Sequence, residues 1–127
     1  MRCFAALFLL AVLPDITYAN TLSSARTALA NWGLAYCINA VSTEKAINTE
    51  AQYTMGAYFQ RGTHDSEEAY EEVRKYISRQ LPSKRLIDRD SGKVRPFVTC
   101  MELVRTSEFN RLIIKQDKHV HPGQDGK

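Results

Sequence analysis

Four closely grouped glutamates are the most suggestive set of reactive side chains in this 127-residue chain: Glu67, Glu68, Glu71 and Glu72. Paired carboxylates act as general acid and base in many hydrolases when the pKa of one of them is raised. On a helix, this spacing instead gives a negative first turn, which the helix dipole favours, followed by a solvated face. We therefore interpret the group as structural, with an enzyme that uses these carboxylates as the alternative.

Histidines and nucleotide-binding motifs offer no better catalytic set. His64 precedes Asp65 at an expected helix start, where an exposed turn residue is typical. His119 and His121 lie near the end of the chain, and two ligands fall short of the full set of a zinc site. The sequence contains no glycine-rich phosphate loop and no serine nucleophile elbow. We predict that the protein is not an enzyme and holds no metal or cofactor.

The first nineteen residues predict a secretory signal peptide. Residues 3–13 form an unbroken apolar run after Arg2, and Thr17 and Ala19 offer small residues at the −3 and −1 positions of a cleavage site. An apolar helix of this length spans about 16 Å, roughly half of a bilayer core. We therefore expect cleavage after Ala19 rather than a membrane anchor, and Cys3 precedes the apolar run, which disfavours a lipoprotein.

Export determines how the remaining cysteines are interpreted. Cys37 and Cys100 are an even pair, and in an oxidising compartment such a pair predicts a disulfide. The alternative is two buried free thiols. A bridge over this separation would contribute roughly 4 kcal/mol by loop entropy, a large part of the ~5 to 15 kcal/mol that stabilises a small domain.

Composition predicts one soluble globular domain, because 44% of residues are hydrophobic and 24% are charged. A net charge of +3, evenly spread, gives no reason to expect nucleic acid as a partner. Apolar residues at helical spacing begin at residue 20 and stop after residue 116. We expect the domain to span 20–116, followed by a disordered tail over 117–127.

The fold class expected is all-α, a small single-domain bundle of four to five helices with one disulfide. The first helix should cover 20–41 and lie at the centre, because it is apolar around much of its circumference. The buried stripes expected on the later helices are Ile47, Ala51, Met55, Tyr58 and Phe59, then Ala69, Val73, Tyr76, Ile77 and Leu81, then Phe97, Cys100, Met101, Leu103 and Val104, and finally Phe109, Leu112 and Ile113.

Capping residues predict where the second and fifth helices begin and end. Ser42 or Thr43 is expected to cap the second helix, and Thr106 or Ser107 the fifth. Gly62 is expected to end the second helix in the left-handed conformation.

The third helix has the clearest expected boundaries. Asp65 should cap its start, with Glu68 reaching back as in a capping box. Pro82 should end it, because a proline disfavours helical geometry in the preceding residue. Glu71 and Lys75 form a favourable i,i+4 pair on its surface.

The segment 82–96 is the longest polar connection, with Lys84, Arg85, Arg89, Lys93 and Arg95 against Asp88 and Asp90. Residues 90–92 are a turn signal, and Leu86-Ile87 could pair with Val94 in a small hairpin. Long loops between helices are often functional. We predict that this loop enters the cleft of a partner protein.

Four local patterns together point to one family. They are Asn31-Trp32-x-Leu34-x-x-Cys37, Gly56-Ala57-Tyr58-Phe59-x-x-Gly62, Glu68-Ala69-Tyr70-Glu71-Glu72-Val73-Arg74, and Thr99-Cys100-Met101-x-Leu103 followed by Ser107-Glu108-Phe109. In this order and spacing, over most of 25–115, the chain resembles the type VI secretion amidase immunity proteins of the fourth amidase class. The resemblance implies a small helical periplasmic dimer that blocks a cysteine amidase attacking peptidoglycan.

The resemblance also implies which residues meet the amidase. Cys37 and Cys100 match the paired cysteines of the family, and its interface uses the third helix and the neighbouring loop. The contacts expected here are Glu71, Arg74, Lys75, Arg79, Arg85, Leu86, Asp88, Arg89, Asp90 and Lys93. The long His-containing tail has no counterpart role in the family. Another exported helical inhibitor, such as a lysozyme inhibitor, is the alternative function.

Overall fold

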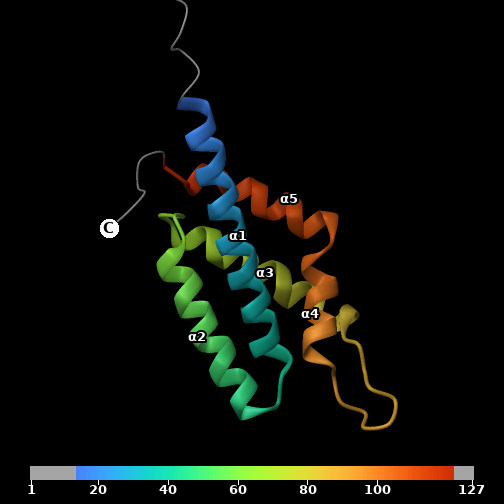
Figure 1. The fold of residues 1–127 in the computed structure, drawn as a ribbon. Coiled ribbons are helices and arrows are strands. Elements are labelled where there is room, and N and C mark those ends of the chain that lie inside the picture. The colour runs from blue at the N-terminus through green and yellow to red at the C-terminus, as the bar shows by residue number, and fades with distance from the viewer. Residues whose placement is uncertain (1–13, 122–127) are drawn as a thin grey trace, which may run out of the picture.

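The computed structural model describes residues 14–121 as a set of five α-helices and one short 3-10 helix (Figure 1). They are α1 Pro14–Val41, α2 Lys45–Arg61, α3 Glu67–Lys84, α4 Pro96–Val104, α5 Ser107–Lys115 and η1 Gln116–His119. The all-α prediction is confirmed. No helix in the described part of the chain is long and apolar enough to cross a membrane.

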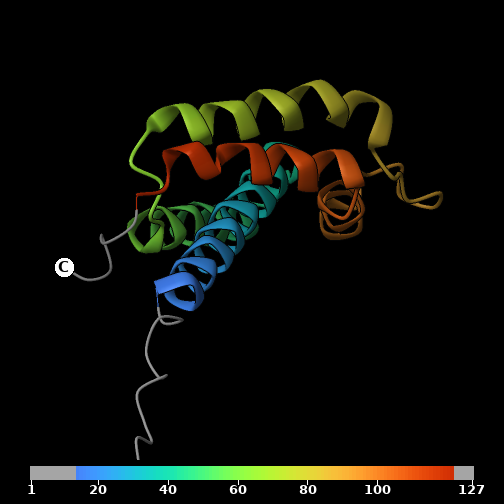
Figure 2. The same cartoon turned by 90° about the horizontal axis from the view of Figure 1, so that it is seen from above.

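Helix α1 lies at the centre, as its two apolar sides predict, with α2 and α4 on either side of it (Figure 1). Helices α3 and α5 lie together on one face of α1 (Figure 2). Gly33 makes this close packing possible, because an added Cβ would lie 2.8 Å from Cγ1 of Val73 and 3.1 Å from Cζ of Phe109. The core residues around this crossing include Leu29, Ile77 and Phe109, all almost fully buried.

The predicted disulfide is confirmed. Cys37 of α1 and Cys100 of α4 are bonded, and both are fully buried. The bond joins residues 63 positions apart. It fixes the middle of the short helix α4, and with it the end of the preceding loop, to the central helix.

Two helix starts differ from the expected ones, and a third agrees. The start of α3 is capped by Ser66, whose hydroxyl accepts from the Glu68 amide at 3.1 Å, so the predicted Asp65 cap and capping box are wrong. The N-cap residue of α2 is Glu44, whose side chain makes no capping bond, so the predicted cap by Ser42 or Thr43 is wrong. The hydroxyl of Ser42 instead accepts from the Glu44 amide. Thr106 caps α5 by accepting from the Phe109 amide, as predicted.

Gly62 follows α2 in an extended conformation with φ of −67°, not the left-handed one expected. A Cβ there would lie 2.4 Å from the hydroxyl of Tyr70. Glycine is therefore needed for the close approach of a buried tyrosine. That tyrosine packs edge-on against Trp32, with ring centroids 5.1 Å apart.

Three other expectations about side chains and helix length need correction. Pro82 does not end α3, which continues to Lys84, because in the last turn few intrahelical bonds remain to be lost. Phe59, placed on a buried stripe, is 53% exposed. The surface pairs on α3 are Glu71–Arg74 at 2.7 Å and Glu72–Lys75 at 3.3 Å, rather than Glu71–Lys75.

The C-terminal residues 116–121 are packed against the helices, which differs from the expected disordered tail. Val120 is buried and pairs with His64 in an antiparallel bridge. Asp117 accepts from the guanidinium of Arg26 on α1. Residues 64–68, 116–121 and Arg26 form what we call the C-terminal corner. Residues 122–127 of the expected tail, and most of the expected signal peptide, lie outside the described residues.

Candidate protein-binding surface

Residues 85–95 form a hairpin between α3 and α4, which confirms the expected pairing. Ile87 and Val94 form an antiparallel bridge, the Asp88 amide donates to Lys93 O at 2.8 Å, and the Arg95 amide donates to Leu86 O at 2.8 Å. The backbone of this polar loop is therefore ordered by its own ladder. We refer to it as the 85–95 hairpin.

The carboxylate of Asp88 organises the turn of this hairpin. Its Oδ1 accepts from the amides of Asp90 at 3.0 Å and Ser91 at 2.9 Å, and from the Ser91 hydroxyl at 3.1 Å. Its Oδ2 accepts from Nε of Arg95 at 3.0 Å and from a second nitrogen of the same guanidinium. These bonds, led by the one from the Ser91 amide, hold the pKa of Asp88 well below its ordinary value.

The base of the hairpin is held to the core through Thr99. The Leu86 amide donates to Oγ1 of Thr99 at 3.0 Å, and Thr99 is fully buried on α4 beside Cys100. On the other strand, Nζ of Lys93 lies 3.8 Å from a carboxylate oxygen of Glu44, before α2. The hairpin is thus positioned by the disulfide-linked helix α4 and not only by α3.

An exposed apolar surface lies beside the hairpin. Leu86 and Ile87 are 43% and 53% exposed, although both are large aliphatic residues. Along α4, the exposed large hydrophobic residues are Phe97, Val98 and Met101. We call these five residues the apolar shoulder. The sequence pattern placed Phe97 and Met101 on a buried stripe, and their exposure is a correction.

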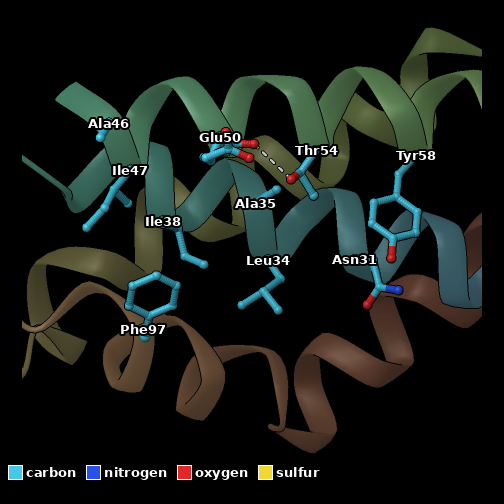
Figure 3. A pocket seen from close by; sticks show the side chains of 11 residues that line it. Asn31, Leu34, Ala35, Ile38, Ala46, Ile47, Glu50, Thr54, Tyr58 and Phe97 are labelled. Carbon is cyan, nitrogen blue, oxygen red and sulfur yellow. Dashed lines mark hydrogen bonds between the residues drawn. The ribbon is translucent and has the colours of Figure 1, made fainter. Parts of the chain in front are cut away.

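A groove of about 430 Å³ separates α2 from the start of α4, with α1 as its floor (Figure 3). Its mainly apolar lining is Asn31, Leu34, Ala35 and Ile38 of α1, Ala46, Ile47, Glu50, Ala51, Thr54 and Tyr58 of α2, and Phe97 of α4. Leu34 and Ile38, on the second apolar side of α1, are only partly buried. Phe97 also borders the hollow at the base of the hairpin, so it joins the two surfaces.

The expected contact residues separate into two sets. Arg85, Leu86, Asp88, Arg89, Asp90 and Lys93 all lie in the hairpin. Glu71, Arg74, Lys75 and Arg79 lie along α3, where Arg74 and Lys75 pair with glutamates of the same helix. Because α3 leads into the hairpin, the two sets join end to end (Figure 1). Residues of the first set differ from one another, since Asp88 is bonded within the hairpin and Arg89 is not.

Sequence reasoning missed Thr99 and the exposed α4 residues Phe97, Val98 and Met101 as parts of this surface, and it gave Arg95 no bond to Asp88. Thr99 gave no signal, because a threonine inside a short apolar helix is unremarkable in any sequence. Phe97, Val98 and Met101 lie at i, i+1 and i+4 of a short apolar helix, and the run of apolar residues on both of its sides was the available sign. One short helix cannot bury two apolar faces against a single neighbour.

The three histidines of the chain lie in the C-terminal corner, away from the hairpin. His64 is buried, and burial lowers its pKa despite the nearby carboxylates of Asp117 and Asp65. His119 lies 3.8 Å from Glu68, and His121 lies 2.5 Å from Asp65. Within residues 14–121 no group of three or more His, Cys, Asp or Glu side chains is arranged to hold a metal ion.

Residues 27–113 match the family model described as type VI secretion system (T6SS), amidase immunity protein. This range includes both cysteines of the disulfide, the whole of α3, the hairpin and α4. No curated protein matches the chain.

Proposed function

The chain belongs to the family of type VI secretion system amidase immunity proteins, and from this premise we propose that it binds and inhibits a cognate peptidoglycan amidase. Such an amidase is a cysteine peptidase effector, and its inhibition in the periplasm would protect the producing cell. On this proposal the chain is an inhibitor and not an enzyme. The observation that supports it most directly is the 85–95 hairpin, a preordered charged projection on a disulfide-linked scaffold.

The hairpin suits a narrow catalytic cleft for three reasons. It is already folded by its own hydrogen bonds, so little conformational entropy is lost on binding. It presents Arg85 and Arg89, both exposed, whose side chains have no hydrogen bond or ion pair with other described residues. It also exposes Leu86 and Ile87, whose burial would favour association by roughly 25 cal/mol per Å².

The proposed interface extends from the hairpin onto α3. It would include Arg85, Leu86, Arg89, Asp90 and Lys93 of the hairpin and Glu71, Arg74, Lys75 and Arg79 of the helix. A standard interface buries about 800 Å² on each partner, and the hairpin with the adjoining face of α3 can supply an area of that order. The surface pairs on α3 are exposed, so they would rearrange toward partner charges at little cost.

We also propose that the protein is a homodimer formed through the α1–α2–α4 groove. The groove has a mainly apolar lining, and Phe97, 54% exposed, is one of its lining residues. Two copies facing each other could each place an apolar shoulder residue on the groove of the other, as an isologous interface requires. Light scattering should give a dimer mass for the native chain and a monomer mass for Phe97→Glu. Tyr53→Glu, on the exposed side of α2, is the matched control and should remain dimeric.

The proposed site of action is the periplasm, reached through a signal peptide cleaved after Ala19. Oxidation there would form the Cys37–Cys100 bond. N-terminal sequencing of the protein recovered from a periplasmic fraction tests this: Asn20 should be the first residue. A protein retained in the cytoplasm with Met1 intact would contradict it.

The function itself is tested by co-expression and by direct inhibition. The probe is the type VI amidase of the producing strain, directed to the periplasm of a Gram-negative host. The chain should prevent lysis, and the purified protein should stop release of peptidoglycan fragments at equimolar concentration. Lysis that continues at high levels of correctly folded, exported chain would overturn the proposal.

A further inference from the structure

The polar side chains at the turn of the 85–95 hairpin fall into two sets. The side chains of Asp88, Ser91 and Arg95 bond to one another or to the hairpin backbone. The side chains of Arg89 and Asp90 have no hydrogen bond or ion pair with other described residues, and both are exposed. One set is satisfied within the loop, and the other is available to a partner.

Asp88 has little capacity left for a partner. Its two carboxylate oxygens accept five hydrogen bonds from Asp90, Ser91 and Arg95. Its backbone also closes the turn, since its carbonyl accepts from the Gly92 amide at 2.9 Å. A contact between the partner and this carboxylate would have to break bonds that order the loop.

The bonds of Asp88 surround the two available residues. Arg89 and Asp90 follow it directly, and the turn closes at Gly92, which has a φ of +68° and so adopts a conformation that favours glycine. The amide of Asp90 is itself one of the donors to Asp88. The directions in which Arg89 and Asp90 leave the backbone are therefore fixed by a residue beside them.

We propose that Asp88 is a positioning residue that holds Arg89 and Asp90 as the specificity-determining pair of the inhibitor. This rests on the proposed function and changes the role of Asp88 from a contact to a support. The matching partner surface would offer a carboxylate or carbonyl oxygen to Arg89 and a hydrogen-bond donor to Asp90. Because an unpaired buried charge is costly, an amidase with the opposite arrangement would be rejected.

The proposal is tested first on the free protein, without any partner. Hydrogen exchange of the Asp90, Ser91 and Lys93 amides should accelerate at least tenfold in Asp88→Ala, while core amides of α1 and α3 stay protected. Asp88→Asn keeps an oxygen that can accept from the turn amides, so it should restore most of the protection. Glu102→Ala, on the exposed side of α4, is the control and should leave hairpin exchange unchanged.

The second test is a double-mutant cycle on binding to the type VI amidase of the producing strain. Asp88→Ala and Arg89→Ala should each weaken binding by about 30-fold, as for interface hot spots. If Asp88 acts through Arg89 and Asp90, adding Asp88→Ala to a variant that carries Arg89→Ala and Asp90→Ala should cause almost no further loss of binding. Multiplicative losses would show that Asp88 contacts the amidase itself and would overturn the positioning role.

The two tests also separate this proposal from the proposed function. Failure of the native chain to bind the amidase would refute the function, whatever the exchange data show. Unchanged exchange in Asp88→Ala would refute positioning even if the native chain binds. Loss of core protection in Asp88→Ala would show a general structural role and likewise count against the proposal.

Discussion

The hairpin and the C-terminal corner each contain an arginine–aspartate ion pair, and the two pairs have different roles. In the hairpin, Arg95 and Asp88 are 7 residues apart in one loop. In the corner, Arg26 and Asp117 are 91 residues apart and join the first helix to the end of the described chain. Both arginines use two guanidinium nitrogens on one carboxylate. The same two residue types therefore close a local turn in the hairpin and join two distant parts of the chain in the corner.

The surroundings of the two pairs differ as well. The corner covers buried groups, including Val120 and Gln116, so its ion pair is coupled to the packing of the core. The hairpin leaves large apolar residues exposed, and its ion pair orders only the loop. An arginine–aspartate pair can therefore serve stability in one region and order a binding loop in another, and sequence separation and burial distinguish the two roles.

The largest effect is expected on removing the disulfide with Cys37→Ala and Cys100→Ala. The free energy of unfolding should fall by about 4 kcal/mol, because the reduced chain gains loop entropy when unfolded. Exchange should rise most at the Leu86 and Arg95 amides, since Thr99, which holds the hairpin, adjoins Cys100. Urea unfolding and hydrogen exchange check both effects. A variant as stable as the native protein would contradict this account.

A smaller effect is expected from Gly92→Ala, which affects only the hairpin. Alanine at a φ of +68° should cost roughly 1 kcal/mol or slightly more, and binding to the amidase should weaken because the turn is distorted. Gly56→Ala is the control. Its Cβ would meet nothing within 4 Å, so the helix preference for alanine should raise stability by about 0.5–1 kcal/mol. Thermal unfolding measures both.

Arg26→Ala affects only the corner. We expect a loss of about 1 kcal/mol in unfolding free energy, because the pair is partly exposed and solvent screens it. The amides of Asp65 and Val120 should exchange faster, while affinity for the amidase stays within twofold. Arg111→Ala, which removes an exposed pair with Glu108, should change stability by less than about 0.5 kcal/mol. A loss of affinity in Arg26→Ala would mean that the two regions are coupled.

The smallest effect expected is the dependence of stability on pH, which should be seen in the C-terminal corner and not in the hairpin. Because burial lowers the pKa of His64, the unfolded chain binds a proton first, and corner stability falls as pH drops through 6.5. The carboxylate of Asp117 opposes this lowering of the His64 pKa, His119 reinforces it, and Asp65 opposes it.

The hairpin should keep its stability over the same pH range. The pKa of Asp88 is held below its ordinary value of 3.8, so its contribution is complete above that value and is lost only on further acidification. Exchange at pH 7 and 5.5 should show faster opening at Val120 but not at Lys93, after correction for intrinsic rates. His64→Leu should flatten the pH dependence of the corner. An unchanged dependence in that variant would exclude His64 as its source.

Much of this fold follows from local patterns in the sequence. Helical spacing predicts the five helices, the cysteine pair predicts the disulfide, and the turn residues before Lys93 predict the hairpin. Docking of residues 116–121 could not be predicted, because one apolar residue, Val120, gives no periodic signal. Its burial depends on the bridge to His64 and on the pairing of Asp117 with Arg26, and each partner is distant in sequence.

The candidate surface was predictable in place but not in detail. A charged loop between two helices indicated the hairpin, and the resemblance indicated α3. Whether a given charge is available depends on hydrogen bonds to backbone amides, and no spacing rule distinguishes Asp88 from Asp90. Exposure of Phe97 and Met101 was also invisible, because an apolar stripe does not specify whether another helix of the same chain covers it.

The long-range pair of the C-terminal corner also determines where the described chain can be extended. It holds the segment ending at His121 against α1, at the end of the molecule away from the hairpin (Figure 1). A fusion partner or surface tether attached beyond that segment should leave the hairpin accessible.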